Sequence, residues 1–353
     1  MKKSYDGWYP LLHGCLSNTE VVKLLMSYAD KHNIILNINE KDKGGEYPLL
    51  LACSEDVNNT EIVKLLMDYS DKHDIILKLN DKNNNKRYPL ELSISNNNIE
   101  NVELLISYAN KHNITLNINE KSYDGWYPLL KACAKNVNNT EIVKLLMDYA
   151  DEHNIILNIN EKNNDGIYPL GLSIYKNNIE NVKLLLSYAN NHNIILNVNE
   201  QNSAFNPLLL ACIYNTEIVK LLLDYADEHG IILNINDKNK TEFYPLASLI
   251  STNNIECVKL LVTYANKHNI NLKINEKMYN GWYPLLEACA NDVNNTEIVK
   301  LLMDYADDHN IILTINEKGN DGLSPLILSI VNKNMENLFY LLLIKTWKIL
   351  NYS

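Results

Sequence analysis

The chain has no apolar run long enough to cross a membrane and no excess of basic residues. Its longest apolar stretch, residues 338–344, is far shorter than the roughly 20 residues that a bilayer-spanning helix needs. Lysine and arginine total 32 against 43 acidic residues, which gives a net charge of -11. Such a surface repels phosphate backbones and anionic lipids, so we expect no nucleic-acid or membrane partner. Residues 1–7 contain no apolar run either, and we expect no secretory signal.

Proline is scarce, and it always occurs at the same point of a repeated unit. Consecutive prolines are 38–41 residues apart, a leucine follows each of them, and tyrosine precedes seven. The nine prolines are Pro10, Pro48, Pro89, Pro128, Pro169, Pro207, Pro245, Pro284 and Pro325. A period of this length indicates stacked supersecondary units that bury their apolar faces against one another. We therefore predict a solenoid that fills the whole chain.

Residues 119–159 illustrate the structure that one unit encodes. The pair Asp124-Gly125 predicts a tight turn with positive φ, and Pro128 fits the first position of a short helix. Thr140 is a good N-cap for a second helix, whose apolar residues recur at helical spacing. Asn154 follows the second helix, and the other units carry Asn, Asp or Gly there, which predicts a left-handed residue at each helix end. Each unit should contain a turn, a short helix, a longer helix and an extended return.

This unit resembles the ankyrin repeat. The matching segments are 118–121 (Ile-Asn-Glu-Lys), Gly125, 128–129 (Pro-Leu), Ala132 and 141–146 (Glu-Ile-Val-Lys-Leu-Leu). The resemblance covers nearly the whole chain in nine copies, and it implies an all-α, ankyrin-type helical solenoid with short hairpin turns between helix pairs. In a single domain 1–353, the nine units would span about 1–38, 39–79, 80–118, 119–159, 160–198, 199–235, 236–274, 275–315 and 316–353.

Three features depart from the family pattern. Tyrosine replaces the usual threonine before most prolines, and Leu130 and its equivalents replace the family's histidine. The hydroxyl-to-imidazole contact associated with that histidine is therefore missing, and we expect aromatic packing in its place. The segment from Glu141 to Asn160 spans 19 positions against 13 in the family pattern, which predicts a second helix about a turn and a half longer.

Near-identical copies within the chain act as an internal alignment. The units alternate between two classes, and residues 120–166 and 276–322 agree at 39 of 47 positions. Positions that stay constant are expected to pack in the core, and positions that change chemistry are expected to be exposed. Between these two blocks, Lys131 becomes Glu287 and Lys135 becomes Asn291.

Histidine and cysteine recur at fixed positions, which favours structural roles. Eight of the nine histidines end a second helix. Stacked helices lie about 8–10 Å apart, whereas zinc ligands lie ~2.1 Å from the ion, so equivalent histidines cannot share a metal. Five of the six cysteines occupy one first-helix position, and we expect buried thiols in a reducing, cytoplasmic setting rather than disulfides. Cys257 is the one thiol that this pattern does not place.

The residue pattern does not predict catalysis. Carboxylates such as Glu120 and Glu161 recur once per unit and are explained by the repeat, whereas a catalytic site needs unlike groups that converge at one place. The sequence has no glycine loop that could cradle a phosphate and no pair of cysteines at zinc spacing. We expect no enzymatic activity, no cofactor and no metal.

The positions that vary between units are the candidates for partner binding. The resemblance implies that the residue two before each proline, and the residues that end the first helix, face a concave binding surface. Aromatic side chains there are typical anchors of interfaces, although packing between neighbouring hairpins would account equally well for the tryptophans. The candidates are Trp8, Arg87, Trp126, Lys131, Lys135, Phe243, Trp282, Glu287 and Asn291.

These observations predict a scaffold that binds another protein along its concave face. The alternative is a targeting or structural segment of a longer polypeptide, because residues 4–10 repeat the interior segment 122–128. In the last unit, Phe339 stands where other units mostly carry lysine, and Trp347 extends the apolar content. Either the tail folds back over this end, or the end docks a second copy or a further repeat. We favour the fold-back, and hence a monomer.

Overall fold

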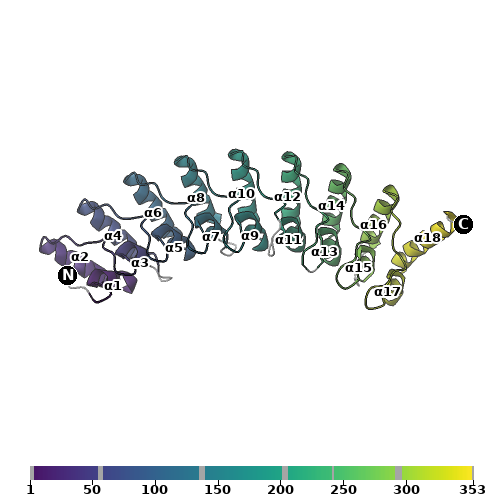
Figure 1. The fold of residues 1–353 in the computed structure, drawn as a ribbon, viewed down its shortest axis with the longest axis horizontal. Helices are drawn as coiled ribbons and strands as arrows, with labels where there is room; N and C mark the ends of the chain where they lie inside the picture. Colours follow the sequence, from purple (N-terminus) through teal and green to yellow (C-terminus); the bar gives the residue numbers. More distant parts are fainter. Residues whose placement is uncertain are drawn as a thin grey trace. The chain divides into compact units, whose positions relative to one another are not determined.

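The computed structural model describes residues 4–54, 59–134, 140–200, 206–240, 242–290 and 296–351, and these residues form helices and no strand (Figure 1). The helices occur in pairs, one pair in each predicted unit. The short first helices are α1 (Pro10–Ser17), α3 (Pro48–Ala52), α5 (Pro89–Ser95), α7 (Pro128–Ala134), α9 (Pro169–Tyr175), α11 (Pro207–Tyr214), α13 (Pro245–Ser251), α15 (Pro284–Ala290) and α17 (Pro325–Val331). The second helices are α2 (Thr19–Lys31), α4 (Thr60–Lys72), α6 (Ile99–Lys111), α8 (Thr140–Glu152), α10 (Ile179–Asn191), α12 (Thr216–Glu228), α14 (Ile255–Lys267), α16 (Thr296–Asp308) and α18 (Met335–Asn351). The predicted all-α helical solenoid is confirmed.

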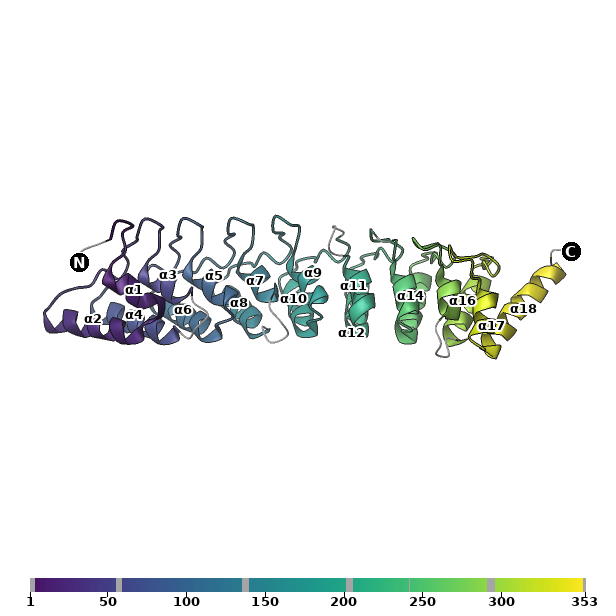
Figure 2. The ribbon, with the colours of Figure 1, turned by 90° about the horizontal axis from the view of Figure 1, so that it is seen from below.

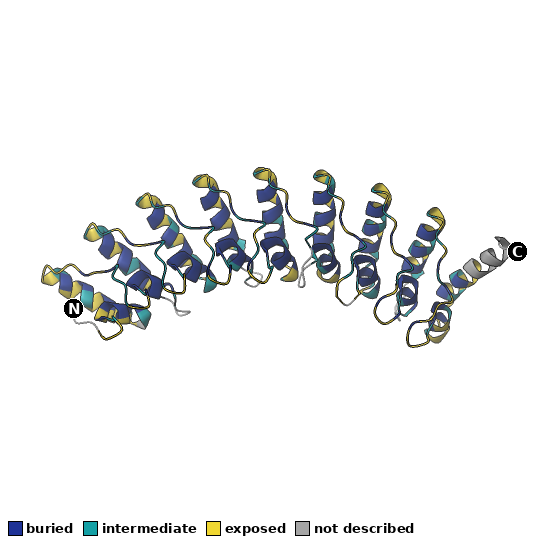
Figure 3. Cartoon of the chain, in the orientation of Figure 1, coloured by how far each residue is buried: buried dark blue, intermediate teal, exposed yellow. Residues whose placement is uncertain are grey.

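Helix contacts divide the chain into two compact units, Met1–Leu196 and Asn197–Ser353. Within each unit, first helices pack on first helices and second helices on second helices, as α5 does on α7 and α6 on α8. In the first unit, the segments that lead from one pair to the next lie on one side of the helices (Figure 2). Buried residues cover the surfaces where the helices of a unit meet (Figure 3). A single continuous domain over residues 1–353 stays a prediction.

Where the hairpin turn before a first helix is described, it contains a residue with positive φ, as the Asp-Gly pair predicts. Gly125 has a φ of 81°, and a Cβ there would lie 2.8 Å from the backbone nitrogen of Asn164 in the next hairpin. In the third repeat Lys86 takes this conformation at φ 60°. Tyr88 is extended before Pro89, which occupies the first turn of α5. The turn thus ends in the geometry that a proline at the helix start requires.

The predicted N-cap of the second helix is wrong by one residue. Thr140 is the first residue of α8 and not its N-cap. Where the preceding residue is described, asparagine usually supplies the cap: the side chains of Asn98 and Asn178 accept from the backbone nitrogens of Asn101 and Asn181. Asparagine caps as well as serine or aspartate because its side-chain oxygen reaches the free amides of the first turn.

The ends of the second helices match the prediction. The residue after each helix-end histidine has positive φ, for example Asn113 at 53° and Gly230 at 64°. The isoleucine that follows donates its backbone N–H to the helix, as Ile114 does to the carbonyl of Ala109 at 2.9 Å. This pairing defines the Schellman motif, which satisfies carbonyls at the helix end and turns the chain into the return segment.

The tyrosine that precedes seven of the nine prolines both packs and forms hydrogen bonds, as Tyr127 shows. Tyr127 is fully buried, and its hydroxyl donates to the carbonyl oxygens of Asn158 and Glu161, at 2.8 Å each. Burial raises its pKa well above the ordinary value. The ring thereby supplies the aromatic packing that we expected, and the hydroxyl ties the start of α7 to the return segment after α8.

Asparagines join successive return segments into a ladder. Nδ2 of Asn119 donates to the carbonyl oxygen of Ile156 at 2.7 Å, while the backbone nitrogen of Asn158 donates to Oδ1 of Asn119 at 3.0 Å. The same pair of bonds is formed by Asn80, Asn236 and Asn275 with the next return segment. One side-chain amide therefore satisfies two backbone groups of its neighbour, which accounts for part of the asparagine content.

The six cysteines are free thiols and buried, which confirms the prediction made for the five at the first-helix position. Burial raises the pKa of Cys133 to about 12. The position of Cys257 follows from a pairing between the two helices of a repeat. Where cysteine lies five residues after the proline of the first helix, the third residue of the second helix is isoleucine or valine. In α13 and α14 the order is reversed: Ile250 is on the first helix and Cys257 is on the second.

The prediction that the C-terminal tail folds back over the last repeat is wrong. Helix α18 runs without a break from Met335 to Asn351, so the tail continues the last helix instead of turning back over it. The side chains of residues 344–351, Trp347 included, lie outside the described set. Phe339 remains 59% exposed, since a straight helix cannot cover its own outer face.

Candidate functional site

Two positions in each repeat lie where the hairpin meets the first helix. We call the residue two before each proline the hairpin row, and the residue three after it the helix row. In the first repeat these are Trp8 and His13, whose ring centroids are 4.6 Å apart. The two positions include most of the sequence-predicted binding candidates.

All five hairpin-row candidates are half-buried. Trp8, Arg87, Trp126, Phe243 and Trp282 all fall in this class. The indole N–H of Trp282 donates to Asp321 in the next hairpin at 2.9 Å, which is the hairpin-to-hairpin packing that we gave as the alternative for the tryptophans. Glu46 makes a similar contact, because it accepts from Asn83 at 2.7 Å. The hairpin row is thus partly framework.

Lys131 and Arg87 belong to an ion network that sequence reasoning missed. Glu91 on α5 is fully buried; Nε of Arg87 lies 2.7 Å from one of its carboxylate oxygens and Nζ of Lys131 2.5 Å from the other. The Lys131 side chain is only 16% exposed. Our expectation that Lys131 is an exposed surface residue is therefore corrected. The equivalents of Glu91 elsewhere are apolar, and this break in the repeat was the available signal.

Glu287 differs from Lys131 in having no partner among the described residues. It lies half-buried on α15, and burial raises the pKa of its carboxyl. The remaining candidates, Lys135 and Asn291, lie outside the described residues.

Six of the helix-end histidines contact the preceding repeat: His73, His112, His153, His192, His268 and His309. Nε2 of His112 lies 2.8 Å from Oδ1 of Asp71 in the preceding repeat, and Nζ of Lys111 lies 2.5 Å from the other oxygen. The His112 ring also packs on Tyr108, with centroids 4.2 Å apart. Within the described ranges, histidine, cysteine and carboxylate side chains form no group that could hold a metal ion. The histidines hold neighbouring second helices together.

The Asp71 contacts make a pH-dependent contribution to stability. The hydrogen bond from Lys111, together with that from His112, lowers the pKa of Asp71 from its ordinary value of 3.8. A carboxyl with a lowered pKa stabilises the folded state above its unfolded pKa, and this contribution is lost as the pH falls through the folded value. We expect Asp71→Asn to lower the urea midpoint at about pH 6, with a difference from the wild type that shrinks as the pH falls below 3.8 and disappears below the folded pKa.

Asparagine fits this position, because Asn110 occupies the equivalent place and accepts from His153 at 2.9 Å. Asp71→Asn therefore changes the charge of this side chain but not its shape. Equal urea midpoints at pH 6, or a difference that does not depend on pH, would contradict the assignment.

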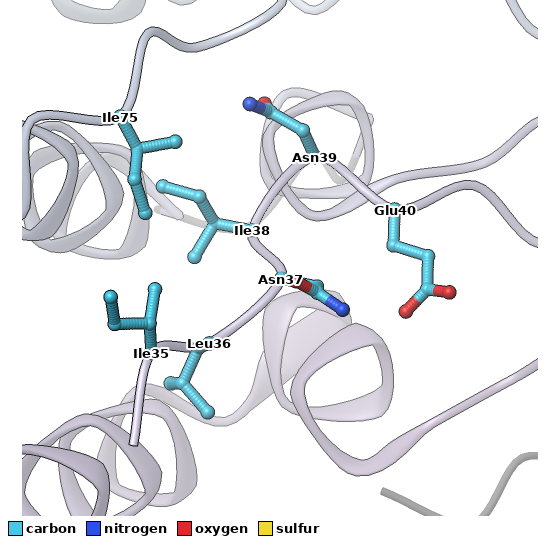
Figure 4. A pocket seen from close by; sticks show the side chains of 7 residues that line it. All are labelled: Ile35, Leu36, Asn37, Ile38, Asn39, Glu40 and Ile75. Atoms are coloured by element: carbon cyan, nitrogen blue, oxygen red, sulfur yellow. The ribbon is translucent and has the colours of Figure 1, made fainter. Parts of the chain in front are cut away.

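A pocket of about 420 Å³ lies on the return segment of the first repeat. It is lined by Ile35, Leu36, Asn37, Ile38, Asn39, Glu40 and Ile75. The side chain of Ile75, from the next repeat, faces those of Ile35 and Ile38 (Figure 4). Glu40 is the only charged side chain in this lining, so the pocket does not bring together the unlike groups that catalysis needs.

Comparison with known proteins identifies the family. A family model described as ankyrin repeats (3 copies) matches residues 11–119, 110–196, 188–274 and 246–349. The chain belongs to the ankyrin repeat family. A similar solved structure is the crystal structure of the human ASB11 ankyrin repeat domain, with a TM-score of 0.47 and 18% identity, over 69% of this chain and 91% of that chain. A search of curated proteins found no match.

Ankyrin repeats are generally protein–protein interaction modules. In this ankyrin repeat chain, no described helix is both long and apolar enough to pass through a bilayer.

Proposed function

We propose that this ankyrin repeat chain is a scaffold that binds a partner protein along the concave face formed by the hairpins and first helices, without turnover or cofactor. The observation that carries the proposal is the contrast between two near-identical repeats. Their framework residues, such as Leu129 and Leu285, are fully buried and unchanged, whereas the paired Lys131 is replaced by Glu287, which is half-buried and has no side-chain partner among the described residues. Such a change on a constant framework alters what the face can bind.

The contacts of the recurring carboxylates support a structural role for them. Nζ of Lys121 lies 2.7 Å from Glu161, and Nζ of Lys277 lies 2.6 Å from Glu317, in each case joining one repeat to the next. Charges that serve the stacking of repeats need no catalytic explanation. The positions left for function are those that differ between repeats.

Trp126→Ala tests the proposed face. We expect proteins captured by the tagged chain to decrease roughly 10-fold or more, because tryptophan is a frequent hot-spot residue. Quantitative mass spectrometry of the captured proteins, with melting curves for each variant, is the measurement.

Tyr123→Ala is the matched control, since Tyr123 is an aromatic residue of the same hairpin and is 81% exposed. It should retain the captured proteins. Equal losses with both variants, or loss only after changes on the second helices such as Tyr28→Ala, would contradict binding by this face.

A further inference from the structure

Glu287 is the only charged residue on the four first helices of the second unit. Helices α11, α13, α15 and α17 otherwise carry apolar, alanine, serine and tyrosine side chains. Glu287 is half-buried, and among the described residues no group gives it a hydrogen bond or an ion pair. A carboxylate at such a position loses part of its hydration without gaining a counter-ion.

The first unit shows which positions surround this carboxylate. There, Arg87 of the hairpin row and Lys131 of the helix row both reach Glu91, two residues after Pro89. The same three positions in the second unit are Phe243, Ala247 and Glu287, on the packed pair α13 and α15. An aromatic ring and a methyl group therefore stand where the guanidinium and the buried carboxylate stand in the first unit.

Trp282 precedes Glu287 in the hairpin of its own repeat. These two residues occupy the positions of Trp8 and His13, whose rings are 4.6 Å apart. The bond from the Trp282 indole to Asp321 fixes the orientation of that ring. By these equivalences we infer that Glu287 lies between the positions of Trp282 and Phe243, and that phenylalanine replaces the Arg87 cation of the first unit.

We propose that Glu287, together with Phe243 and Trp282, receives a cationic side chain, arginine or lysine, from a basic segment of a partner protein. A carboxylate bordered by aromatic rings suits a cation, because the ion pair and the negative faces of the rings attract the same group. The internal pair of Lys131 and Glu91 shows that this layer accommodates such a contact. The net charge of -11 also favours a basic partner. This inference rests on the proposed function.

A library of random 12-residue peptides displayed on phage, selected on the full chain, provides the probe. We expect selected peptides to share an arginine or lysine, and Glu287→Gln to weaken their Kd roughly 10-fold or more. Asp308→Asn is the matched control, because it removes one negative charge from an exposed site at the end of α16. It should change Kd by less than about 2-fold.

A double-mutant cycle identifies the contact. Replacing the shared basic residue of a peptide with alanine should weaken binding to the wild type but have little further effect on the Glu287→Gln chain. Peptides that bind without a basic residue, or equally well to the Glu287→Gln chain, would overturn this inference and leave the scaffold function standing. A library that yields no peptide binder would count against both.

Discussion

Lys131→Glu is expected to destabilise the first compact unit by about 3–5 kcal/mol, the usual effect of removing one partner of a buried ion pair. The substitution places a second carboxylate against Glu91, which is fully buried. Arg87 alone would have to compensate two negative charges, and its own side chain is partly exposed. Hydrogen–deuterium exchange should show faster exchange in α5 to α9, and the urea midpoint should fall.

The double variant Glu91→Leu/Lys131→Leu is the control. Leucine occupies both equivalent positions in the second repeat, Leu50 and Leu51, which are buried there. Replacing a buried ion pair with apolar residues of similar size is often neutral or stabilising, so this variant should recover most of the lost stability. A Lys131→Glu chain that stays within about 0.5 kcal/mol of the wild type, as surface variants do, would mean that the pair contributes nothing.

Local features of the repeat could be predicted from the sequence because each depends on one or two adjacent residues. A proline has a fixed φ and suits the start of a helix, and α7 begins at Pro128. Asparagine tolerates positive φ, and Asn113 adopts it. The period then places each pair of helices. These inferences need no knowledge of which side chains meet across repeats.

The ion network could not be predicted in this way, because it joins Lys131 to Glu91, which is about 40 residues away in the preceding repeat. The sequence predicts Lys131 to be exposed because Glu287 replaces it in a near-identical repeat. The replacement is possible because a second change accompanies it: Ala247 stands where Glu91 stands in the first unit. A residue that varies between copies is therefore either exposed or paired with a second residue that varies with it. These two cases can be told apart only when the contacts between neighbouring repeats are known, as for Lys131 and Glu91.

Tyr127→Phe should destabilise the first unit by about 1–3 kcal/mol, because it leaves the carbonyl oxygens of Asn158 and Glu161 without the hydroxyl that bonds both. The ring stays, so packing is unchanged and the loss reports the hydroxyl alone. Tyr123→Phe is the control: its ring is largely exposed, and it should change the urea midpoint little. Faster hydrogen exchange confined to the return segment after α8, with the helices of that repeat less affected, is the expected pattern. Equal effects of the two substitutions would show that water replaces the Tyr127 hydroxyl at no cost, and that aromatic packing alone holds the hairpin to the return segment.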